Sequence, residues 1–223
     1  MTFEEALRGK KAALIDMDGV LYDSMPRHTE SWRETMLEEG LDIPQEEFFL
    51  YEGMTGAATI NLLMEREKGI RLSAEECKAI YARKAERFRR RGAPLPMPGA
   101  SEMIERLRAR GLLTVLVTGS AQNTLLERLD ADYPGAFPPE RRVTALDVIH
   151  GKPHPEPYLR GLEKAGVCAA EAVVIENAPL GVRAGKGAGI FTIAWPTGPI
   201  PREAFLREGA DLILERGEFL KKC

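Results

Sequence analysis

Short apolar segments recur along the chain and alternate with amphipathic ones. The apolar runs cover residues 11–16, 112–118, 172–176, 190–195 and 211–214. Helical patterns precede the later runs, as over 100–110 and 155–165. Apolar strands that alternate with amphipathic helices are typical of an open parallel sheet with helices on both faces. We therefore predict an α/β fold with a doubly wound parallel sheet, in which all strands end at one edge and ligands bind there.

A helix-rich segment without a strand pattern interrupts this alternation. Its helical patterns cover residues 28–39, 57–67 and 74–91. The segment ends in Gly92-Ala-Pro-Leu-Pro-Met-Pro-Gly99. Proline at every second position cannot continue a helix, so we expect a stiff linker there and infer a helical cap inserted after the first strand. The predicted domains are a discontinuous core, residues 1–20 and 95–223, and a cap, residues 21–94.

Composition narrows the function classes. The chain has 223 residues, of which 44% are hydrophobic and 29% charged, and this excludes a disordered, collagenous or membrane-spanning chain. Lys and Arg number 31 against 34 Asp and Glu, for a formal net charge of −3. This balance gives no reason to expect a nucleic acid or a membrane surface as a partner. An anionic ligand must therefore be held by a local site.

The cysteines and the N-terminus indicate a reducing compartment. Cys77, Cys168 and Cys223 are spread singly, which fits incidental thiols better than disulfides or a zinc site. The N-terminus is too acidic and too weakly apolar for a signal peptide, and no apolar run approaches the roughly 18 residues of a membrane span. We expect a cytoplasmic protein. The sequence leaves the oligomeric state open, and a monomer is compatible with it.

Polar residues follow four of the predicted strands or lie just beyond them. These segments are Asp16-Met-Asp18 with Gly19, Thr118-Gly119-Ser120, Lys152 in Gly-Lys-Pro-His-Pro-Glu-Pro, and Glu176-Asn177. They supply carboxylates, a hydroxyl followed by free backbone N–H groups, an ammonium group and an acid–amide pair. Oxygen ligands suit Mg²⁺, whereas lysine, hydroxyl and N–H groups suit phosphoryl oxygens. The set predicts a site for a phosphoryl group beside a divalent cation.

These segments resemble, in order, the four motifs of the haloacid dehalogenase superfamily, and the resemblance covers almost the whole chain. The stretches DMDGVLYDSMPRH, LVTGS, GKPHPEPY and VVIENAPLGVRAGKGAGI are most similar to β-phosphoglucomutase-like members. Taken singly, each of them is better explained by a structural role, as a strand-end turn, a Thr-Gly-Ser loop or a surface lysine. Four motifs in order at strand ends are specific. The resemblance implies a Rossmann-like core with an inserted helical cap.

The resemblance also implies roles for single residues. Asp16 matches the nucleophile, which forms an aspartyl phosphate, and Asp18 matches the general acid–base. The implied phosphate-binding groups are Thr118, the N–H groups of Gly119 and Ser120, and Lys152. The implied Mg²⁺ ligands are Asp16, the backbone carbonyl of Asp18, Glu176 and Asn177.

Asn177 departs from the common pattern, because most relatives carry a second acid there. An amide oxygen can still ligate Mg²⁺. Removing one anion about 5 Å from the phosphoryl group lessens repulsion by about 3 kcal/mol at an effective dielectric constant of 20. That change favours a highly charged substrate. The alternative interpretation is that Asn177 only N-caps the helix around Pro179, and both roles can hold together.

Two predicted cap residues match positions that β-phosphoglucomutases use. His28 is expected to orient or gate Asp18, and Lys84 to contact the substrate across the closed cleft. The alternatives are a histidine at a helix start and a solvated lysine on a helix face. Both alternatives remain open from the sequence.

The loop around Glu52 argues against a mutase. The mutases usually place at the position of Gly56 an arginine that holds the phosphate that is not transferred, and here no arginine follows until Arg66. Glu52 would repel a second phosphate, but it could hold a second cation or a metal-bound water. The EGxTGA loop with Glu-Asn-Ala-Pro resembles a branch that includes inorganic pyrophosphatases. Met54 departs from that branch, which can carry arginine there.

The sequence thus predicts a Mg²⁺-dependent phosphohydrolase that acts on a small phosphorylated substrate through an aspartyl phosphate. Pyrophosphate is the leading single substrate, with a small phosphate monoester or sugar phosphate as the close competitor. The second hypothesis is an isomerase of the β-phosphoglucomutase kind. The third is a catalytically silent sensor of a phosphorylated ligand, motivated by Asn177 alone.

Overall fold

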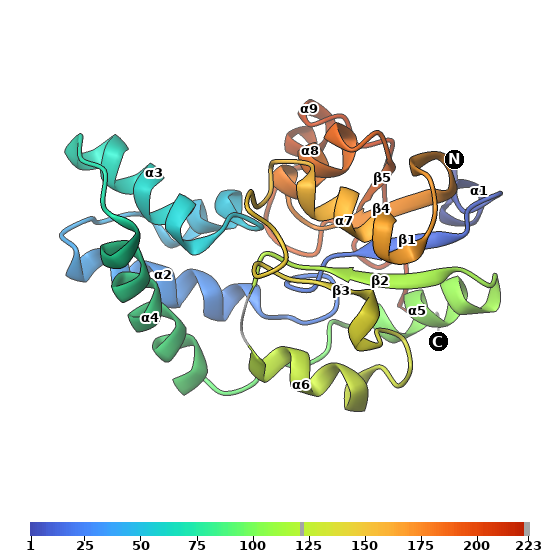
Figure 1. Ribbon diagram of the computed structural model, residues 1–223, viewed down its shortest axis with the longest axis horizontal. Helices are drawn as coiled ribbons and strands as arrows, with labels where there is room; N and C mark the ends of the chain where they lie inside the picture. Colours follow the sequence, from blue (N-terminus) through green and yellow to red (C-terminus); the bar gives the residue numbers. More distant parts are fainter. Residues whose placement is uncertain (121–122, 221–223) are drawn as a thin grey trace.

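The computed structural model describes residues 1–120 and 123–220, and within these ranges six parallel strands form one sheet in the order β3-β2-β1-β4-β5-β6 (Figure 1). The strands are β1 (Ala12–Ile15), β2 (Leu113–Val117), β3 (Arg142–Val143), β4 (Ala172–Glu176), β5 (Phe191–Ala194) and β6 (Leu212–Ile213). The direction of the strand order reverses at β1, which pairs with β2 on one side and β4 on the other. The predicted α/β fold with a doubly wound parallel sheet is confirmed.

The central strands are apolar because helices cover both of their faces. Every residue of β1 and β4 is buried. Alternate residues point to opposite faces of a strand, so Ala13 and Ile15 join one hydrophobic cluster while Ala12 and Leu14 join another. Hydropathy did not predict β3, because this edge strand has only two residues and one of them is an arginine.

The core helices divide between the two faces. They are α1 (Phe3–Ala6), α5 (Ala100–Ala109), α6 (Asn123–Asp132), α7 (Glu156–Ala165), α8 (Pro179–Gly187) and α9 (Arg202–Arg207), with short 3₁₀ turns η2 (Pro139–Arg141) and η3 (Ala169–Glu171). Residues of α1, α5 and α6 pack in the cluster that contains Ile15, and residues of α7 and α8 pack in the one that contains Leu14. Two layers of helices therefore enclose the sheet.

The cap helices lie beyond one end of the sheet, on the left in Figure 1. They are α2 (Met25–Glu38), the 3₁₀ helix η1 (Gln45–Tyr51), α3 (Gly56–Lys68) and α4 (Ala74–Arg90). They share a hydrophobic cluster of their own, whose buried members are Met36, Leu41, Ile43, Phe48, Ile60, Leu63, Met64, Cys77 and Ile80. Phe88 of α4 packs in a core cluster instead, together with Leu21 and Tyr22. The domain boundaries of the sequence analysis stay a prediction.

Two linkers join the cap to the core and run side by side. Tyr22 in the outgoing linker pairs with Pro96 in the returning one. The N–H of Asp23 donates to the carbonyl of Leu95 at 2.9 Å, and the N–H of Met97 donates to that of Leu21 at 2.8 Å. Helix α4 ends at Arg90, ahead of the prolines. The cap therefore connects to the core through a short paired segment.

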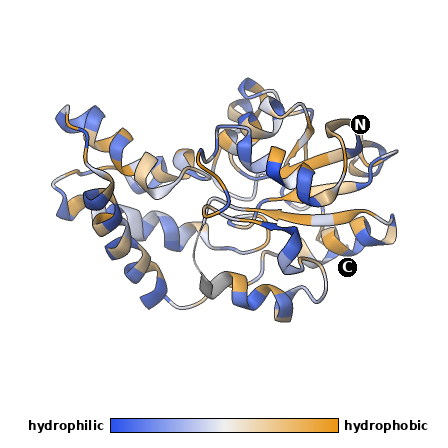
Figure 2. Ribbon diagram, in the orientation of Figure 1, coloured by the Kyte–Doolittle hydropathy of each residue, from blue (hydrophilic) through white to orange (hydrophobic). Residues whose placement is uncertain are grey.

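Figure 2 shows mainly hydrophobic residues along the central strands, while the cap helices mix hydrophilic and hydrophobic residues. Over residues 1–120 and 123–220, no helix combines the length and the apolar character that crossing a membrane requires. Cys77 is buried and Cys168 is exposed, and both are free thiols. Cys223 lies outside the described residues.

Candidate active site

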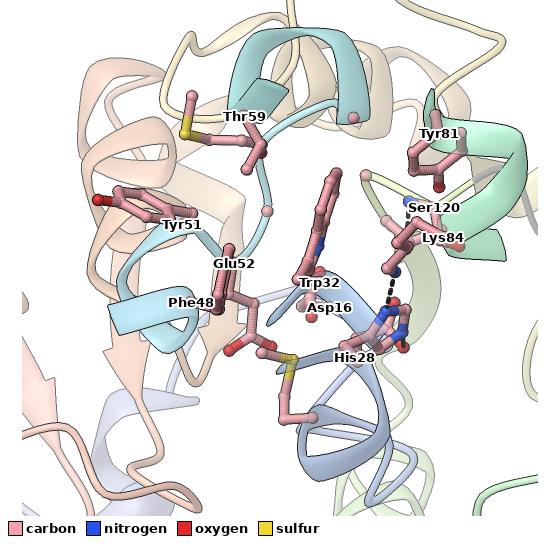
Figure 3. A pocket seen from close by; sticks show the side chains of 17 residues that line it. Asp16, His28, Trp32, Phe48, Tyr51, Glu52, Thr59, Tyr81, Lys84 and Ser120 are labelled. Carbon is pink, nitrogen blue, oxygen red and sulfur yellow. Dashed lines mark hydrogen bonds and ion pairs between the residues drawn. The ribbon is translucent and has the colours of Figure 1, made fainter. Parts of the chain in front are cut away.

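The predicted site residues meet at the C-terminal edge of the sheet. Asp16 follows β1, Thr118 follows β2, and Glu176 is the last residue of β4. Lys152 comes from the loop before α7. A cavity of about 60 Å³ opens above them, between the core and the cap. It is lined by Asp16, Asp18, Met25, His28, Trp32, Phe48, Tyr51, Glu52, Gly53, Met54, Gly56, Thr59, Tyr81, Lys84, Thr118, Gly119 and Ser120 (Figure 3).

Lys152 lies between two carboxylates at the floor of this site. Its Nζ is 2.5 Å from Oδ1 of Asp16 and 2.6 Å from Oε1 of Glu176, and it also donates to the carbonyl of Val117 at 3.0 Å. Burial alone would lower the pKa of Lys152, but the charges of Asp16 and Glu176 raise it above its usual value. Lys152 is therefore a permanent cation beside the predicted nucleophile.

Glu176 is held by four hydrogen-bond donors. Tyr158 donates its hydroxyl to Oε1 at 2.7 Å, on the oxygen that also contacts Lys152. Oε2 accepts the N–H groups of Asn177 at 3.1 Å and Ala178 at 3.3 Å. A Cβ at Gly181 would lie 1.9 Å from Oε1, so only glycine leaves room for the carboxylate. These contacts hold Glu176 against Lys152, and its role as a metal ligand stays a prediction.

Asp16 is a buried carboxylate among other negative charges. Burial raises its pKa to about 8; Glu176 and Asp18 add to this rise, and Lys152 only partly offsets it. A cation beside Asp16 would favour the ionised form that a nucleophile requires. The site is therefore electrostatically suited to a bound cation.

The loop after β2 turns back on itself beside Asp16. The N–H of Ser120 donates to Oγ1 of Thr118 at 3.0 Å. A Cβ at Gly119 would lie 2.7 Å from the carbonyl oxygen of Gly53 in the cap. Glycine at 119 therefore permits the close approach of the cap loop to the core.

Asp18 is connected to the cap by a chain of hydrogen bonds. Its Oδ1 accepts the hydroxyl of Ser24 at 2.6 Å and contacts Nε2 of His28 at 3.0 Å. The Nδ1 of His28 is 2.5 Å from Nζ of Lys84, the dashed contact in Figure 3. Burial alone would raise the pKa of Asp18, but His28 and Ser24 lower it, while burial and Lys84 lower the pKa of His28. A neutral His28 that donates from Nε2 and accepts at Nδ1 satisfies every contact.

Lys84 is enclosed by aromatic rings. It is 2% exposed, so the alternative of a solvated lysine is wrong. Its Nζ lies 5.2 Å from the ring centre of Trp32, 5.4 Å from that of Phe88 and 5.9 Å from that of Tyr81. Burial lowers the pKa of Lys84 to about 7, although Asp18 acts in the opposite direction. The cap thus places beside Nδ1 of His28 an amine whose protonation can change near pH 7.

Glu52 and Asn177 join the cap to the core. The Nδ2 of Asn177 donates to Oε1 of Glu52 at 2.8 Å. The N-cap of α8 is Ala178, and no side chain caps that helix end, so the alternative of Asn177 as a helix cap is wrong. Its side chain turns to Glu52 instead. A Cβ at Gly19, where φ is +80°, would lie 1.9 Å from Nδ2 of Asn177, so glycine is required there.

Two oxygens at this contact are buried without a partner. Within the described residues, Oε2 of Glu52 and Oδ1 of Asn177 have no hydrogen-bond donor. Buried polar atoms are normally satisfied. Burial, followed by the negative charge of Asp16, raises the pKa of Glu52 well above its usual value. The unpaired oxygens together with the carboxylate of Asp16 are hard donors of the kind that Mg²⁺ prefers, so the residues fit the implied cation.

The cap side of the cavity is aromatic and offers little positive charge. Among the described residues that line it, Lys84 is the one cap residue with a basic side chain of the Lys or Arg type. A Cβ at Gly56 would lie 2.1 Å from the ring of Tyr81. That ring therefore fills the place of a side chain at position 56.

Sequence reasoning assigned no role to three residues that shape the site. Tyr158 lies inside the GKPHPEPY stretch and Ser24 inside the DMDGVLYDSMPRH stretch. Their positions within these motifs are the sequence signal that could have identified them. Tyr81 lies three residues before Lys84, and nothing local marks it. Each of the three acts through a contact that only the folded chain creates.

Comparisons with known proteins identify a family model and several relatives that are similar to this chain. A family model described as "Hydrolase: haloacid dehalogenase-like hydrolase" matches residues 10–189. A structure from Bacteroides vulgatus, provisionally named a β-phosphoglucomutase, is 46% identical with a TM-score of 0.90 and covers 97% of this chain and 93% of its own. Hexitol phosphatase A of Escherichia coli is 31% identical over 82% of each chain. The phosphorylated carbohydrates phosphatase of Thermotoga maritima is 31% identical over 82% of this chain and 83% of its own.

Proposed function

The chain belongs to the haloacid dehalogenase-like hydrolase family, and from that premise we propose that it is a Mg²⁺-dependent phosphohydrolase acting through a phosphorylated Asp16. The observation that carries the proposal is the contact of 2.5 Å between Lys152 and Asp16, a residue that lines the cavity. A carboxylate can attack a phosphoryl dianion only where neighbouring positive charge offsets their repulsion. Lys152 supplies such charge permanently.

The proposed reaction has two transfers. An oxygen of Asp16 forms a bond to phosphorus while the bond from phosphorus to the leaving oxygen breaks. Asp18 gives a proton to that oxygen from its protonated form, which is the minor form of this residue because His28 and Ser24 lower its pKa. Asp18 then takes a proton from water, whose oxygen attacks phosphorus and releases Asp16 and inorganic phosphate. Lys152, the hydroxyl of Thr118 and the N–H of Gly119 offset the charge on the phosphoryl oxygens, and the N–H of Ser120 orients the Thr118 hydroxyl.

Asp18 is oriented for these proton transfers by the cap. Ser24 and His28 both contact Oδ1, so we assign Oδ2 to proton transfer. Closure of the cap brings His28 and Lys84 to this carboxylate, which links proton transfer to a cavity shielded from water.

The cation-binding residues that we propose are Asp16, the backbone carbonyl of Asp18 and Oδ1 of Asn177. The chemistry that Mg²⁺ supplies when bound is positive charge against the transferring phosphoryl group. Glu176, which the family resemblance also places among the ligands, has both oxygens engaged by Lys152, Tyr158 and backbone N–H groups. We propose that it acts chiefly by holding Lys152.

For the substrate we propose inorganic pyrophosphate. The unpaired Oε2 of Glu52 lies at the contact with Asn177, beside the predicted cation site. A protonated Glu52 can donate to a phosphate oxygen, and an ionised one can bind a cation that accompanies a highly charged substrate. This supports a small, strongly anionic leaving group, as in the pyrophosphatase-containing branch that the loop resembles.

A sugar phosphate is the second candidate. Two of the three relatives named above are a hexitol phosphatase and a phosphatase of phosphorylated carbohydrates. Aromatic residues of the cavity wall, Trp32 and Tyr81 among them, offer flat apolar faces to an organic leaving group. For the mutase alternative, the ring of Tyr81 over Gly56 takes the place of the arginine that would hold the second phosphate.

Phosphate release from Mg-pyrophosphate, measured beside a panel of hexose phosphates and small phosphomonoesters, tests both candidates. We expect the highest kcat/KM for pyrophosphate, and we expect Glu52→Ala to impair pyrophosphate cleavage much more than cleavage of an activated aryl phosphate. Preference for a sugar phosphate, with equal effects of Glu52→Ala on both reactions, would reject pyrophosphate and leave the Asp16 chemistry standing. Formation of glucose 6-phosphate from β-glucose 1-phosphate with a bisphosphate primer would establish the mutase instead.

A further inference from the structure

A second group of potential metal ligands lies on the outer surface of the loop that carries Lys152. His150 and His154 flank this lysine in the sequence, and Glu156 begins α7 two residues later. One ligand atom from each of the three residues lies within 4.8 Å of the others. Both histidines are exposed and Glu156 is half-buried. An ion could therefore reach the group directly from solvent.

The carboxylate of Glu156 is held in place by the backbone. It accepts the N–H groups of Ile149 and His150, both at 2.9 Å. A ligand that is already ordered loses little conformational freedom on binding a cation.

Both imidazoles present Nδ1 to this glutamate. Nδ1 of His150 lies 3.1 Å from Oε2 of Glu156. Nδ1 of His154 accepts the N–H of Glu156 at 3.2 Å, and the two rings are 4.7 Å apart between centroids. An N–H in the first turn of a helix can turn to water instead. Each of the two Nδ1 atoms thus contacts Glu156, and one ligand atom from each of the three residues lies within 4.8 Å of the others.

The spacing and chemistry of this set favour a transition-metal ion. Two ligands of a tetrahedral ion with bonds of about 2.0–2.1 Å lie about 3.3 Å apart, close to the 3.1 Å between His150 and Glu156. Small rotations of exposed imidazoles can bring in His154. Two imidazoles with one carboxylate suit Zn²⁺, Ni²⁺ and Cu²⁺, whereas Mg²⁺ prefers oxygen ligands alone.

The chain has so few histidines that a metal ion bound by two imidazoles can be assigned to particular residues. There are three histidines. The third, His28, is buried with both ring nitrogens engaged, by Asp18 and Lys84. Any ion that binds two imidazoles of one molecule must therefore take His150 and His154.

We propose that His150, His154 and Glu156 form a surface site for a divalent transition-metal ion, with Zn²⁺ as the preferred occupant among abundant ions. This site is separate from the cation site at Asp16 and does not depend on the proposed reaction. Its position on both sides of Lys152 would place a bound ion on the same loop as the catalytic lysine.

Calorimetric titration with Zn²⁺ in excess Mg²⁺, which occupies the cation site at Asp16, tests the proposal. We expect one equivalent to bind, and we expect His150→Gln and His154→Gln each to weaken binding about tenfold or more, as loss of a ligand or of its support does at metal sites. Glu163→Gln, on the exposed side of the same helix, is the matched control and should bind like the wild type. Circular dichroism melts establish that each variant is folded.

Electron paramagnetic resonance with Cu²⁺ as the probe supplies a readout independent of affinity and activity. We expect hyperfine coupling to two imidazole nitrogens in the wild type and to one in either histidine variant. Absence of saturable Zn²⁺ binding, binding that both variants retain unchanged, or coupling to a single imidazole in the wild type would each overturn the three-residue site.

Discussion

The core and the cap each bury one lysine at the candidate active site, and the two lysines have opposite surroundings. Lys152 and Lys84 are each 2% exposed. Lys152 lies between two carboxylates, which raise its pKa. Lys84 lies among three aromatic rings and an imidazole, and burial lowers its pKa to about 7. The same side chain at the same depth is a fixed cation in the core and an adjustable one in the cap, because the partners decide which form is stable.

The strongest test of the core half of this comparison is Asp16→Asn. The variant keeps the shape of the side chain but removes the nucleophilic charge beside Lys152. We expect turnover to fall by about a thousandfold or more, with a circular dichroism spectrum like that of the wild type. Turnover near the wild-type level would mean that the nucleophile is assigned wrongly.

Lys152→Met should lower the free energy of unfolding, in contrast to the matched change at Lys84. It leaves Asp16 and Glu176 buried without their shared cation, and breaking a buried ion pair costs about 3–5 kcal/mol. Denaturant unfolding at pH 7 measures the loss. A loss below about 1 kcal/mol would contradict the arrangement at the core lysine.

Lys84→Met is the matched change in the cap. Methionine has nearly the same length, suits an aromatic environment and carries no charge to bury. We expect the free energy of unfolding at pH 7 to be unchanged or raised, by no more than about 2 kcal/mol. Turnover should fall about tenfold, because His28 loses the donor at Nδ1 that helps to orient Asp18. A destabilisation as large as that of Lys152→Met would remove the contrast between the two regions.

The pH dependence of stability sharpens the same comparison. The folded state depresses the pKa of Lys84 to about 7, below the value of about 10.4 in an unfolded chain. Between these values the unfolded state binds more protons, so this group makes stability rise with pH. The stability gain of Lys84→Met over the wild type should be largest at and below pH 7 and shrink toward pH 10. For Lys152, whose pKa is raised, the stabilisation is constant below about pH 10. Chemical unfolding of the wild type and of Lys84→Met at several pH values measures this effect. A difference in the free energy of unfolding that stays constant with pH would mean that Lys84 has an ordinary pKa.

The smallest expected effect is that of Tyr158→Phe. It removes one of the two donors on Oε1 of Glu176 and leaves Lys152 in place. We expect a loss of about 1 kcal/mol in the free energy of unfolding and a decrease of a few-fold in kcat, because Glu176 holds Lys152 less firmly. An unchanged kcat alongside the stability loss would assign Tyr158 to packing alone.

The sequence predicted the core of this site better than its cap. Asp16, Thr118 and Glu176 follow apolar runs, and the parallel sheet that those runs predict must bring strand ends to one edge. The contacts that these residues make with the cap could not be predicted from the sequence. Asn177 turns toward Glu52, although its position before a helix suggested a cap, since a contact across the two domains cannot be seen in a local pattern.

The cap lysine illustrates the same limit. A lysine on a charged helix is usually solvated, and Lys84 is preceded by Arg83 and followed by Glu86 and Arg87. Only the packing of α2 against α4 places Trp32 and His28 around it. The resemblance to a family identified Lys84 as a candidate, but the physical reason for its burial is a set of contacts that only the folded chain makes.

The pairing of the central strand has a consequence for the synthesis of the protein on the ribosome. Ala12 in β1 pairs with Leu113 on one side and with Ala172 on the other. At about 5–20 residues per second, on the order of ten seconds or more pass before both neighbours have been translated. The cap helices α2, α3 and α4 are contiguous and can pack against one another during that delay. We therefore expect the inserted segment to become compact first. During that time β1, which is apolar on both faces, is unpaired and accessible to chaperones.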